Sequence, residues 1–399
     1  MVEAQEINPV FPDYNNSILN LSCSILQHYG ITPKHPTLYK IDELLGRNPK
    51  HVVLILLDGL GMNILENKLN IRDFLRRNFL TDYSSVFPPT TTASTTTLLS
   101  GLSPIEHGWL GWDLYFEQEN KTVCCFKNTL QSTDTPAAEY GIANKYLPYE
   151  TIVDQINKAN TAKANIVFPF GDNPHPELND WVSAIKKSIK TDETTFTYAY
   201  WEEPDASLHL KGQKTKETEE AIRDINSALT ELCETARDTL FIITADHGHI
   251  SIENDFIEEN YPQLADMLVR QTSIEPRAIS FYVKPEFMED FPKEFNALFG
   301  NDYVLFTKEE VIKKELFGPG EPNPNLTGIG DFVAAAVSSR TLLWNKKQKQ
   351  FFSHHAGLSQ EEMRIPLIAY QSRAKRNPLT VFFTILGIIA AFIFYLWIS

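Results

Sequence analysis

An almost continuous aliphatic run over residues 51–57 constrains the fold of this chain more than any other feature. Strands of a parallel sheet are buried on both faces, so they read as unbroken runs of Val, Ile and Leu. The run ends in Asp58-Gly59-Leu60-Gly61. In open α/β sheets, the site lies beyond the carboxyl ends of the strands, where such an acid and its glycines would stand. We therefore predict a central strand with a functional carboxylate at its end.

Strands and helices alternate along much of the remaining chain. We predict strands over residues 166–168, 195–201 and 240–244, and a helix with one apolar face over residues 217–237. Alternation of this kind predicts an α/β fold with a doubly wound, largely parallel sheet.

The chain divides into three expected parts. Residues 1–35 contain a packing helix, residues 36–372 form the main domain, and residues 373–399 form a basic flank with an apolar tail. Within the main domain, prolines and acidic clusters are dense between residues 255 and 325. We predict an inserted cap there, and expect the core to resume near residues 329–337.

Carboxylates and imidazoles gather at the predicted strand ends. In a doubly wound sheet these ends converge on one crevice, which a late loop can also reach. The groups expected there are Asp58, Asp205, His209, Asp246, His247 and His355. Three carboxylates and three imidazoles form an oxygen and nitrogen ligand set that suits zinc or a similar divalent ion. Because these ligands exceed the needs of one tetrahedral site, the sequence predicts two metal ions.

The stretch over residues 84–112 holds six threonines between Pro88-Pro89 and Gly101. Proline disfavours helix on its N-terminal side and glycine commonly ends one, so residues 93–100 are predicted to form a short helix. One threonine then lies at or just before the first turn. Unpaired N–H groups and the helix dipole favour a phosphate oxygen or an alkoxide there. The structural alternative is a Ser/Thr N-cap with a surface threonine patch, and this stretch alone leaves both open.

Charge and cysteine content exclude some classes of protein. The formal net charge is -15 and no long basic stripe is present, which argues against a surface that coats nucleic acid. The protein can still bind small anionic ligands if cations in the site outweigh the repulsion from the negative net charge. Of the four cysteines, Cys124 and Cys125 are adjacent and would face opposite sides of a strand, so we expect no disulfide framework.

The C-terminal tail contains an uncharged apolar run over residues 379–398. About 20 such residues suffice to span a bilayer as a helix. Arg373, Lys375 and Arg376 precede the run, and positive charges favour the cytosolic side. The N-terminus lacks the basic and apolar regions of a signal peptide. We therefore predict a single-pass C-terminal transmembrane anchor with a cytosolic catalytic body; the alternative is a buried core helix.

The ordered motifs of this chain resemble those of the alkaline phosphatase superfamily, specifically its type I phosphodiesterase and nucleotide pyrophosphatase-like branch. They are LLDGLG, FPPTTT, LLSGLSPIEHG, EEPDASLH, TADHGH and HHAGLS, and the resemblance spans residues 48–370. In that family the nucleophile lies nine residues before the start of a Ser/Thr-Gly-x-x-Pro-x-x-His-Gly motif, which here begins at Ser100. The resemblance therefore selects Thr91 as nucleophile, with Thr90 and Thr92 as alternates.

The resemblance also implies roles for the predicted ligands. One ion would be held by Asp58, Thr91, Asp246 and His247, and the other by Asp205, His209 and His355. His355 is preferred to His354 because it directly precedes the small residues Ala356-Gly357. Zinc is the expected ion, and manganese is compatible with the same ligands. Metal coordination would activate the threonine hydroxyl, and a phosphothreonine would form and then be hydrolysed.

One position departs from the family. Diesterase members often place an asparagine shortly after the His-Gly pair, and Trp112 stands there in this chain. Trp109, Trp112 and Tyr115 could stack on a nucleobase, or they could pack the wall of the site.

We expect an enzyme that hydrolyses phosphodiester or pyrophosphate bonds in small phosphate esters, nucleotides among them. Within the same fold, the alternatives are a phosphomonoesterase, a phosphonate hydrolase and a phosphoethanolamine-type transferase. From another class, the alternative is a non-catalytic, membrane-anchored binding protein. The intact set of ligands favours an enzyme, and the metal content of the purified protein discriminates between the two classes.

Overall fold

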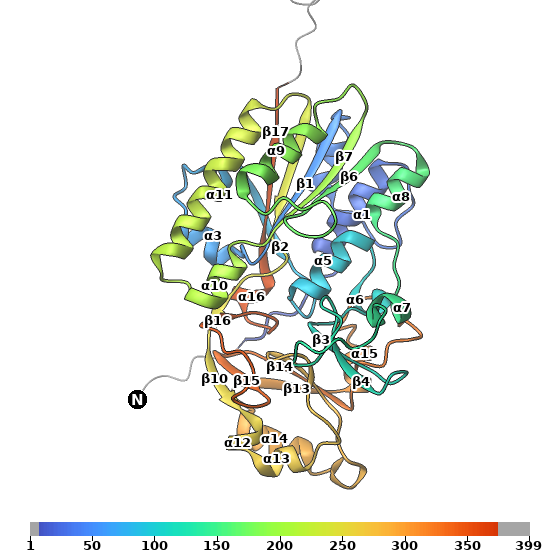
Figure 1. Cartoon of the computed structure of the whole chain (residues 1–399), viewed down its shortest axis with the longest axis vertical. Helices are drawn as coiled ribbons and strands as arrows, with labels where there is room; N and C mark the ends of the chain where they lie inside the picture. Colours follow the sequence, from blue (N-terminus) through green and yellow to red (C-terminus); the bar gives the residue numbers. More distant parts are fainter. Residues whose placement is uncertain (1–7, 374–399) are drawn as a thin grey trace, which may run out of the picture.

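Strand β1 (His51–Leu57) is the central strand of the larger of two lobes in the computed structural model, which describes residues 8–373 (Figure 1). All of its side chains are buried, and it pairs in parallel with β7 (Thr195–Trp201) and β8 (Thr239–Thr244). Burial on both faces explains why every residue of the strand after His51 is Val, Leu or Ile, as predicted.

The sheet of the larger lobe has the order β2-β17-β8-β1-β7-β6. Its remaining strands are β2 (Phe79–Ser84), β6 (Lys163–Val167) and β17 (Arg364–Gln371). Only β17 runs against its neighbours in this sheet; the other strands share one direction. The predicted α/β fold with a largely parallel sheet is therefore confirmed.

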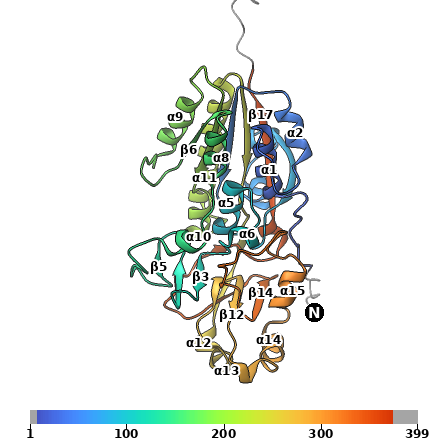
Figure 2. The same cartoon turned by 90° about the vertical axis from the view of Figure 1, so that its right-hand side faces the viewer.

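Helices cover both faces of this sheet, with α9 and α11 on one side and α1 and α2 on the other (Figure 2). Helix α1 packs on α2 and α5, and α11 packs on α9 and α4. The helices of this lobe are α1 (Ile18–His28), α2 (Tyr39–Leu45), α3 (Met62–Lys68), α4 (Phe74–Arg77), α5 (Thr91–Ser100), α6 (Pro104–His107), α8 (Ile152–Ala159), α9 (Leu178–Ser188), α10 (Asp205–Lys211), α11 (Lys216–Thr235) and α16 (Gln360–Met363).

The smaller lobe is built on an antiparallel sheet with the order β13-β14-β12-β11-β3-β4-β5. Its strands are β3 (Asp113–Phe116), β4 (Lys121–Cys124), β5 (Thr129–Leu130), β11 (Ser273–Glu275), β12 (Ala278–Phe281), β13 (Tyr303–Thr307) and β14 (Phe332–Ala336). Its helical segments are α7 (Ile142–Tyr146), α12 (Ile257–Asn260), α13 (Pro262–Asp266), η1 (Pro285–Phe287), α14 (Phe291–Phe299) and α15 (Lys308–Lys313). Two short strand pairs come from the segments that connect the two lobes along the chain. They are β9 (Ile250–Ser251) with β16 (Ser353–His354), and β10 (Glu253–Phe256) with β15 (Arg340–Leu343).

The extent of the smaller lobe differs from the predicted insertion over residues 255–325. Strands β3 to β5 come from the segment that follows the threonine stretch, and β14 lies where we expected the core to resume. The link between β3 and β11 joins Asp113 to Ile274, which are far apart in the chain. Local patterns cannot reveal such a pairing, because each strand is short and its partner is distant in sequence.

A buried ion pair connects the two lobes. Arg277 follows β11, and its Nε and Nη2 donate to Glu362 Oε1 and Oε2 over 2.7 and 2.8 Å. Both side chains are fully buried. Glu362 also accepts from the amide of Gly357 over 2.7 Å, and its carbonyl accepts from the amide of Gly248 over 2.9 Å. Removing either partner would leave a buried charge unpaired. Because Glu362 also bonds to Gly248 and Gly357, the ion pair holds in place the loops that carry His247 and His355.

The predicted transmembrane helix over residues 379–398 lies outside the described residues. Among residues 8–373, none of the helices combines the length and the apolar character needed to span a bilayer.

Candidate active site

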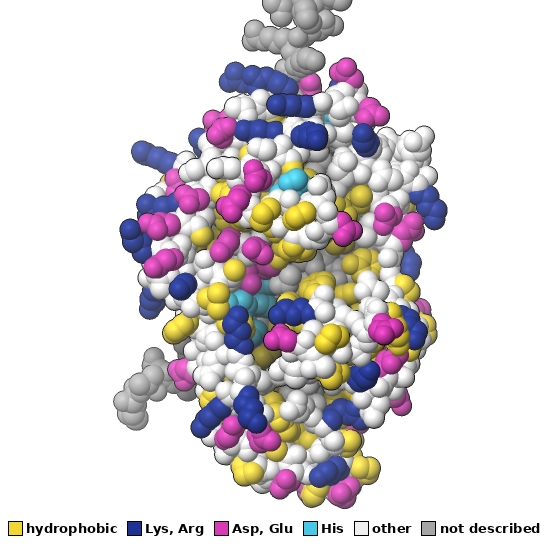
Figure 3. Space-filling model, in the orientation of Figure 1, with side chains coloured by type: hydrophobic (Ala, Val, Ile, Leu, Met, Phe, Trp, Pro, Cys, Tyr) yellow, Lys and Arg dark blue, Asp and Glu magenta, His cyan; other side chains and the backbone are white. Residues whose placement is uncertain are grey.

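The carboxyl ends of three neighbouring strands form the floor of the site. Asp58 follows β1, Asp205 begins α10 soon after β7, and Asp246 follows β8. Because β1 pairs with both β7 and β8, the three carboxylates are brought to one edge of the sheet. Histidine side chains are visible in the space-filling view where the two lobes meet, at this same edge (Figure 3).

The first ligand group is the name used here for the predicted ligands Asp58, Thr91, Asp246 and His247. The hydroxyl of Thr91 lies 3.3 and 3.4 Å from the two oxygens of Asp58, and 3.2 Å from Nε2 of His247. His247 Nε2 is 3.2 Å from Asp58 Oδ1 and 3.6 Å from Asp246 Oδ2. The latter oxygen is buried and has no hydrogen-bond partner among the described residues. An orphaned carboxylate oxygen in such a cluster fits a divalent cation.

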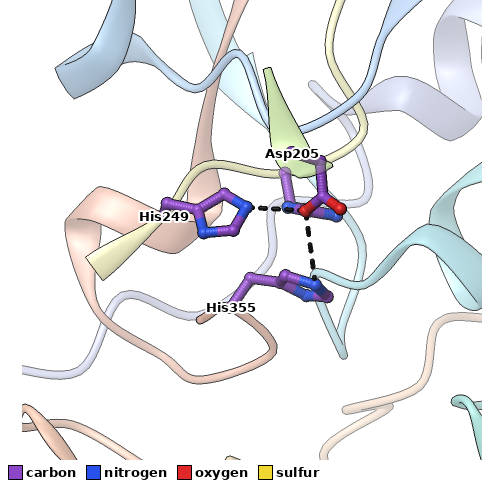
Figure 4. Close-up of side chains that lie close together, drawn as sticks. Asp205, His249 and His355 are labelled. Carbon is purple, nitrogen blue, oxygen red and sulfur yellow. Dashed lines mark hydrogen bonds and ion pairs between the residues drawn. The ribbon is translucent and has the colours of Figure 1, made fainter. Parts of the chain in front are cut away.

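The second ligand group is the name used here for the predicted ligands Asp205, His209 and His355. Oδ1 of Asp205 lies 3.2 Å from Nε2 of His209 and 3.8 Å from Nε2 of His355. A third imidazole, that of His249, is closer still, with 2.7 Å between its Nε2 and the same oxygen (Figure 4). Asp205, His247, His249 and His355 can present ligand atoms within 4.8 Å of one another.

The hydrogen bonds of three imidazoles fix which nitrogen faces the carboxylates. In each ring Nδ1 lies beside a backbone carbonyl, which can only accept, so Nδ1 carries a proton and the neutral ring directs the lone pair of Nε2 into the site. The pairs are His247 Nδ1 with Gly248 O (3.0 Å), His209 Nδ1 with Ser353 O (2.8 Å) and His355 Nδ1 with Pro89 O (3.2 Å). Lone pairs that face carboxylate oxygens need a proton or a cation between them.

Nδ1 of His354 has both an acceptor and a donor beside it. It lies 3.0 Å from the carbonyl oxygen of His355 and 2.9 Å from the amide nitrogen of the same residue. His209, His354 and His355 can present ligand atoms within 4.8 Å of one another, so His354 is a candidate ligand alongside His355.

The carboxylates compete with burial in setting the charge of His247. Burial lowers the pKa of His247, but the charges of Asp246 and Asp58 outweigh it and raise the pKa to about 10. Burial and the charge of Asp58 in turn hold the pKa of Asp246 well above its ordinary value. A proton thus occupies the first ligand group when no cation does, as expected for a metal site that releases protons on loading.

The N-terminus of α5 adjoins the first ligand group. Thr90 is the N-cap residue and Thr91 is the first residue of the helix. Within residues 8–373, no group accepts a hydrogen bond from the amides of Thr91, Thr92 and Ala93, whereas the amide of Ser94 bonds to the carbonyl of Thr90. These free amides and the positive end of the helix dipole create a place for a phosphoryl oxygen beside the hydroxyl of Thr91.

Sequence reasoning missed three side chains that contact this site. Tyr200, at the end of β7, donates its hydroxyl proton to Asp58 Oδ2. His249 contacts Asp205, and Glu275 of the smaller lobe accepts from the hydroxyl of Thr90 over 2.7 Å. The TADHGH motif contains His249, but neither its spacing nor its residue type indicates which carboxylate it meets.

The three aromatic residues predicted to face a substrate have different environments. Trp109 is buried and its indole N–H donates to a backbone carbonyl, while Tyr115 is buried beneath the guanidinium of Arg270. Only Trp112 is substantially exposed, at 38%, and its ring lies 6.0 Å from that of Phe126, which is also exposed. For Trp109 and Tyr115, the wall-packing alternative describes the structure better than base stacking.

This fold, with its acid and imidazole groups around a threonine at a helix N-terminus, is that of a phosphoric ester hydrolase. The family model described as type I phosphodiesterase / nucleotide pyrophosphatase matches residues 52–358. The chain belongs to this family, within the alkaline phosphatase superfamily. Members of the family hydrolyse phosphodiester bonds, and the chain is an enzyme of this class.

Solved structures of ectonucleotide pyrophosphatase / phosphodiesterase 5 share this fold. The murine protein is 19% identical with a TM-score of 0.61, and the match covers 82% of this chain and 89% of that one. The human protein is 17% identical with a TM-score of 0.62, and the match covers 82% of this chain and 91% of that one. An inactive murine variant in complex with AMP is 18% identical with a TM-score of 0.61, and the match covers 82% of this chain and 91% of that one. Among curated proteins, no match was found.

Proposed function

We propose that this protein hydrolyses phosphodiester or pyrophosphate bonds of nucleotide-like substrates, with Thr91 as the nucleophile and a phosphothreonine as intermediate. The observation that carries the proposal is the position of the Thr91 hydroxyl, 3.2 Å from His247 Nε2 and 3.3 Å from Asp58, at the open N-terminus of α5. A half-buried threonine with a carboxylate acceptor for its proton and an anion site beside it has the parts that nucleophilic catalysis needs.

The two ligand groups fit two divalent ions, and zinc is the ion we expect. Asp58, Thr91, Asp246 and His247 would hold one; Asp205, His209 and His355 would hold the other. When bound, such ions lower the pKa of the threonine hydroxyl and stabilise the charge of the transition state. Manganese accepts the same oxygen and nitrogen ligands, so the metal is to be determined by loading experiments.

The residues of the chain have distinct tasks in the proposed reaction. The oxygen of Thr91 attacks phosphorus while the bond from phosphorus to the leaving alcohol or phosphate oxygen breaks, and that group departs to solvent. The Asp58 carboxylate lies within reach of the threonine proton. The free amides of the first turn of α5 bind a non-bridging oxygen. Tyr200 holds Asp58 by its hydroxyl hydrogen bond. Water then hydrolyses the phosphothreonine, and two successive displacements give net retention at phosphorus.

One feature favours a substrate with an aromatic group. The exposed rings of Trp112 and Phe126 offer flat apolar faces beside the anion site. AMP in the related murine structure agrees with a nucleotide substrate.

The test uses the full chain, loaded with zinc, and two chromogenic substrates. We expect release of nitrophenol from the nitrophenyl ester of thymidine monophosphate, and much slower release from nitrophenyl phosphate. Faster turnover of the monoester would favour the phosphomonoesterase alternative. Zinc binding without turnover of either ester would favour a phosphonate hydrolase, a transferase or a binding protein.

We also propose that the apolar run at residues 379–398 anchors the protein in a membrane with the catalytic body in the cytosol. The proposal rests on the length of the run and on the basic residues before it. The full chain should sediment with membranes and resist extraction at alkaline pH. Recovery in the supernatant would contradict the anchor.

A further inference from the structure

Glu275 is a buried carboxyl beside the nucleophile that the proposed reaction does not use. It ends β11 in the smaller lobe, is 8% exposed, and reaches the N-terminus of α5 in the larger lobe. Its Oε1 accepts two hydrogen bonds, from the hydroxyl of Thr90 over 2.7 Å and from the amide of Trp112 over 2.8 Å. The side chain therefore links the smaller lobe to the residue directly before Thr91.

This contact changes the usual behaviour of the N-cap residue. A threonine at the N-cap normally turns its oxygen toward the amides of the first turn and accepts a hydrogen bond there. Thr90 makes no such bond. Its hydroxyl points to Glu275 instead, and the amides of Thr92 and Ala93 stay free for a ligand.

The backbone before Glu275 is strained in a way that supports a functional role. Ile274 has a φ of 76°, in the left-handed region that a β-branched residue rarely enters. A Cβ added at Gly111 would lie 2.7 Å from the carbonyl oxygen of Ile274, so the two segments approach closely only because position 111 is glycine. Strain of this kind persists where the surrounding structure holds it, and it clusters at functional sites.

We propose that Glu275 is a positioning residue: it holds the hydroxyl of Thr90 away from the first turn of α5 and so keeps that turn open to a phosphoryl oxygen of the substrate. This inference rests on the proposed function of the same site. Without an acceptor at position 275, the hydroxyl of Thr90 turns back to cap the helix and competes with the substrate for the amides.

The experiment combines two variants of Glu275 with one of Thr90 in the full, zinc-loaded chain. Glu275→Leu removes the acceptor, whereas Glu275→Gln keeps a carbonyl oxygen for both donors. Thr90→Val removes the competing hydroxyl with little change in shape. The readouts are the affinity for inorganic phosphate by calorimetry and kcat/KM for the thymidine monophosphate nitrophenyl ester, with zinc content measured alongside.

We expect Glu275→Leu to weaken phosphate binding and kcat/KM by about tenfold, the size of effect expected for a lost hydrogen bond at a site. Glu275→Gln should stay within about twofold of the parent, because it preserves both hydrogen bonds. In the Thr90→Val background, Glu275→Leu should have little further effect, since no hydroxyl is left to compete.

Equal losses from Glu275→Leu in the parent chain and in the Thr90→Val background would overturn the inference, as would unchanged phosphate affinity in the single variant. If Glu275→Leu does not fold, Glu275→Asp is compared in the same two backgrounds, because its carboxylate falls one methylene short of Thr90. A loss confined to the parent background supports the inference, and equal effects overturn it. Phosphate binding that depends on Glu275 without ester turnover would contradict the proposed function alone.

Discussion

The two ligand groups of this site are neighbours, yet they differ in charge and exposure. In the first group, Asp58, Asp246 and His247 are at most 2% exposed, and two carboxylates face one imidazole. In the second group, Asp205 is 18% exposed and is met by three imidazoles when His249 is included. The first group also contains the hydroxyl of Thr91. The comparison indicates a closed, anionic site that would activate the nucleophile and a more open, imidazole-rich site facing solvent.

The two ligand groups also differ in the pKa values of their carboxylates. Burial and Asp58 hold the pKa of Asp246 well above its ordinary value. Burial would also raise the pKa of Asp205, but the charge of His209 outweighs it and holds that pKa well below the ordinary value. Burial lowers the pKa of His249 to about 3, so its ring is neutral near pH 7. A cation would thus relieve carboxylate repulsion in the first group and replace an imidazolium in the second.

The largest expected effect comes from removing the proposed nucleophile. Thr91→Ala should lower kcat for the diester by about 10³-fold or more, because no other group would form the covalent intermediate. Zinc content should change little, since the remaining ligands of the first group stay in place. Steady-state kinetics and metal analysis of the purified protein check both statements. Residual activity within tenfold of the parent would favour Thr90 or Thr92 as the nucleophile, and Thr90→Ala and Thr92→Ala would then distinguish them.

His249 tests whether the second group depends on its additional imidazole. His249→Gln should weaken binding of the second ion by about 10- to 100-fold, the usual cost of losing a hydrogen-bond partner of a metal ligand, and leave the first ion bound. Zinc competition with a chromogenic chelator measures both affinities. His51 is the matched control: it is a buried imidazole at the other end of β1, bonded to Thr195 Oγ1 over 2.8 Å. Equal losses in His51→Gln would indicate general destabilisation instead.

The affinity of the first group for zinc should depend on pH. His247 must lose its proton to bind, and its pKa is raised to about 10, so affinity should rise about tenfold per pH unit between pH 7 and 9. The same raised pKa stabilises the metal-free fold below about pH 6.5, and this contribution is lost as pH rises through 10. Zinc titrations with a competing chelator at several pH values provide the measurement. A flat profile would mean that His247 is already neutral in the metal-free protein.

The smallest expected effect is the difference between the two ligand groups in the chelator concentration at which each loses its ion. Because the second group has one carboxylate and is more exposed, it should lose its ion first, at a chelator concentration several-fold lower than the first group requires. Metal analysis should therefore pass through a stage with one ion per chain, and diester turnover should fall in that stage. Simultaneous loss of both ions would show that the two groups bind as one cooperative unit.

Much of the larger lobe could be predicted because its signals are local. An almost continuous aliphatic strand such as β1 indicates burial on both faces. The glycine after α5 ends that helix in the left-handed conformation, with a φ of 71° at Gly101. The acids that follow β1 and β8 stand at strand ends by their position in the chain. The predicted helix over residues 93–100 begins slightly earlier, so Thr91 lies in its first turn.

The smaller lobe was harder to predict. Strand β14 alternates between two apolar clusters, with Val333 facing one and Ala334 facing the other, so its sequence resembles that of a core strand of the parallel sheet. Its membership of the second sheet is decided by pairing with β12 and β13. Aromatic residues raise a similar difficulty, because Trp109 and Trp112 each follow a glycine and only one of them is exposed.

The sequence by itself determined the α/β class of the larger lobe, the chemistry of the ligand set and the threonine at a helix N-terminus. These properties follow from residue type and short-range periodicity, which act over a few neighbouring positions. Only the tertiary structure decided that His249 meets Asp205, that Tyr200 holds Asp58, and that Glu275 reaches Thr90 from another lobe. Such contacts depend on long-range strand pairing and side-chain direction, and a linear pattern of residues does not record either of them.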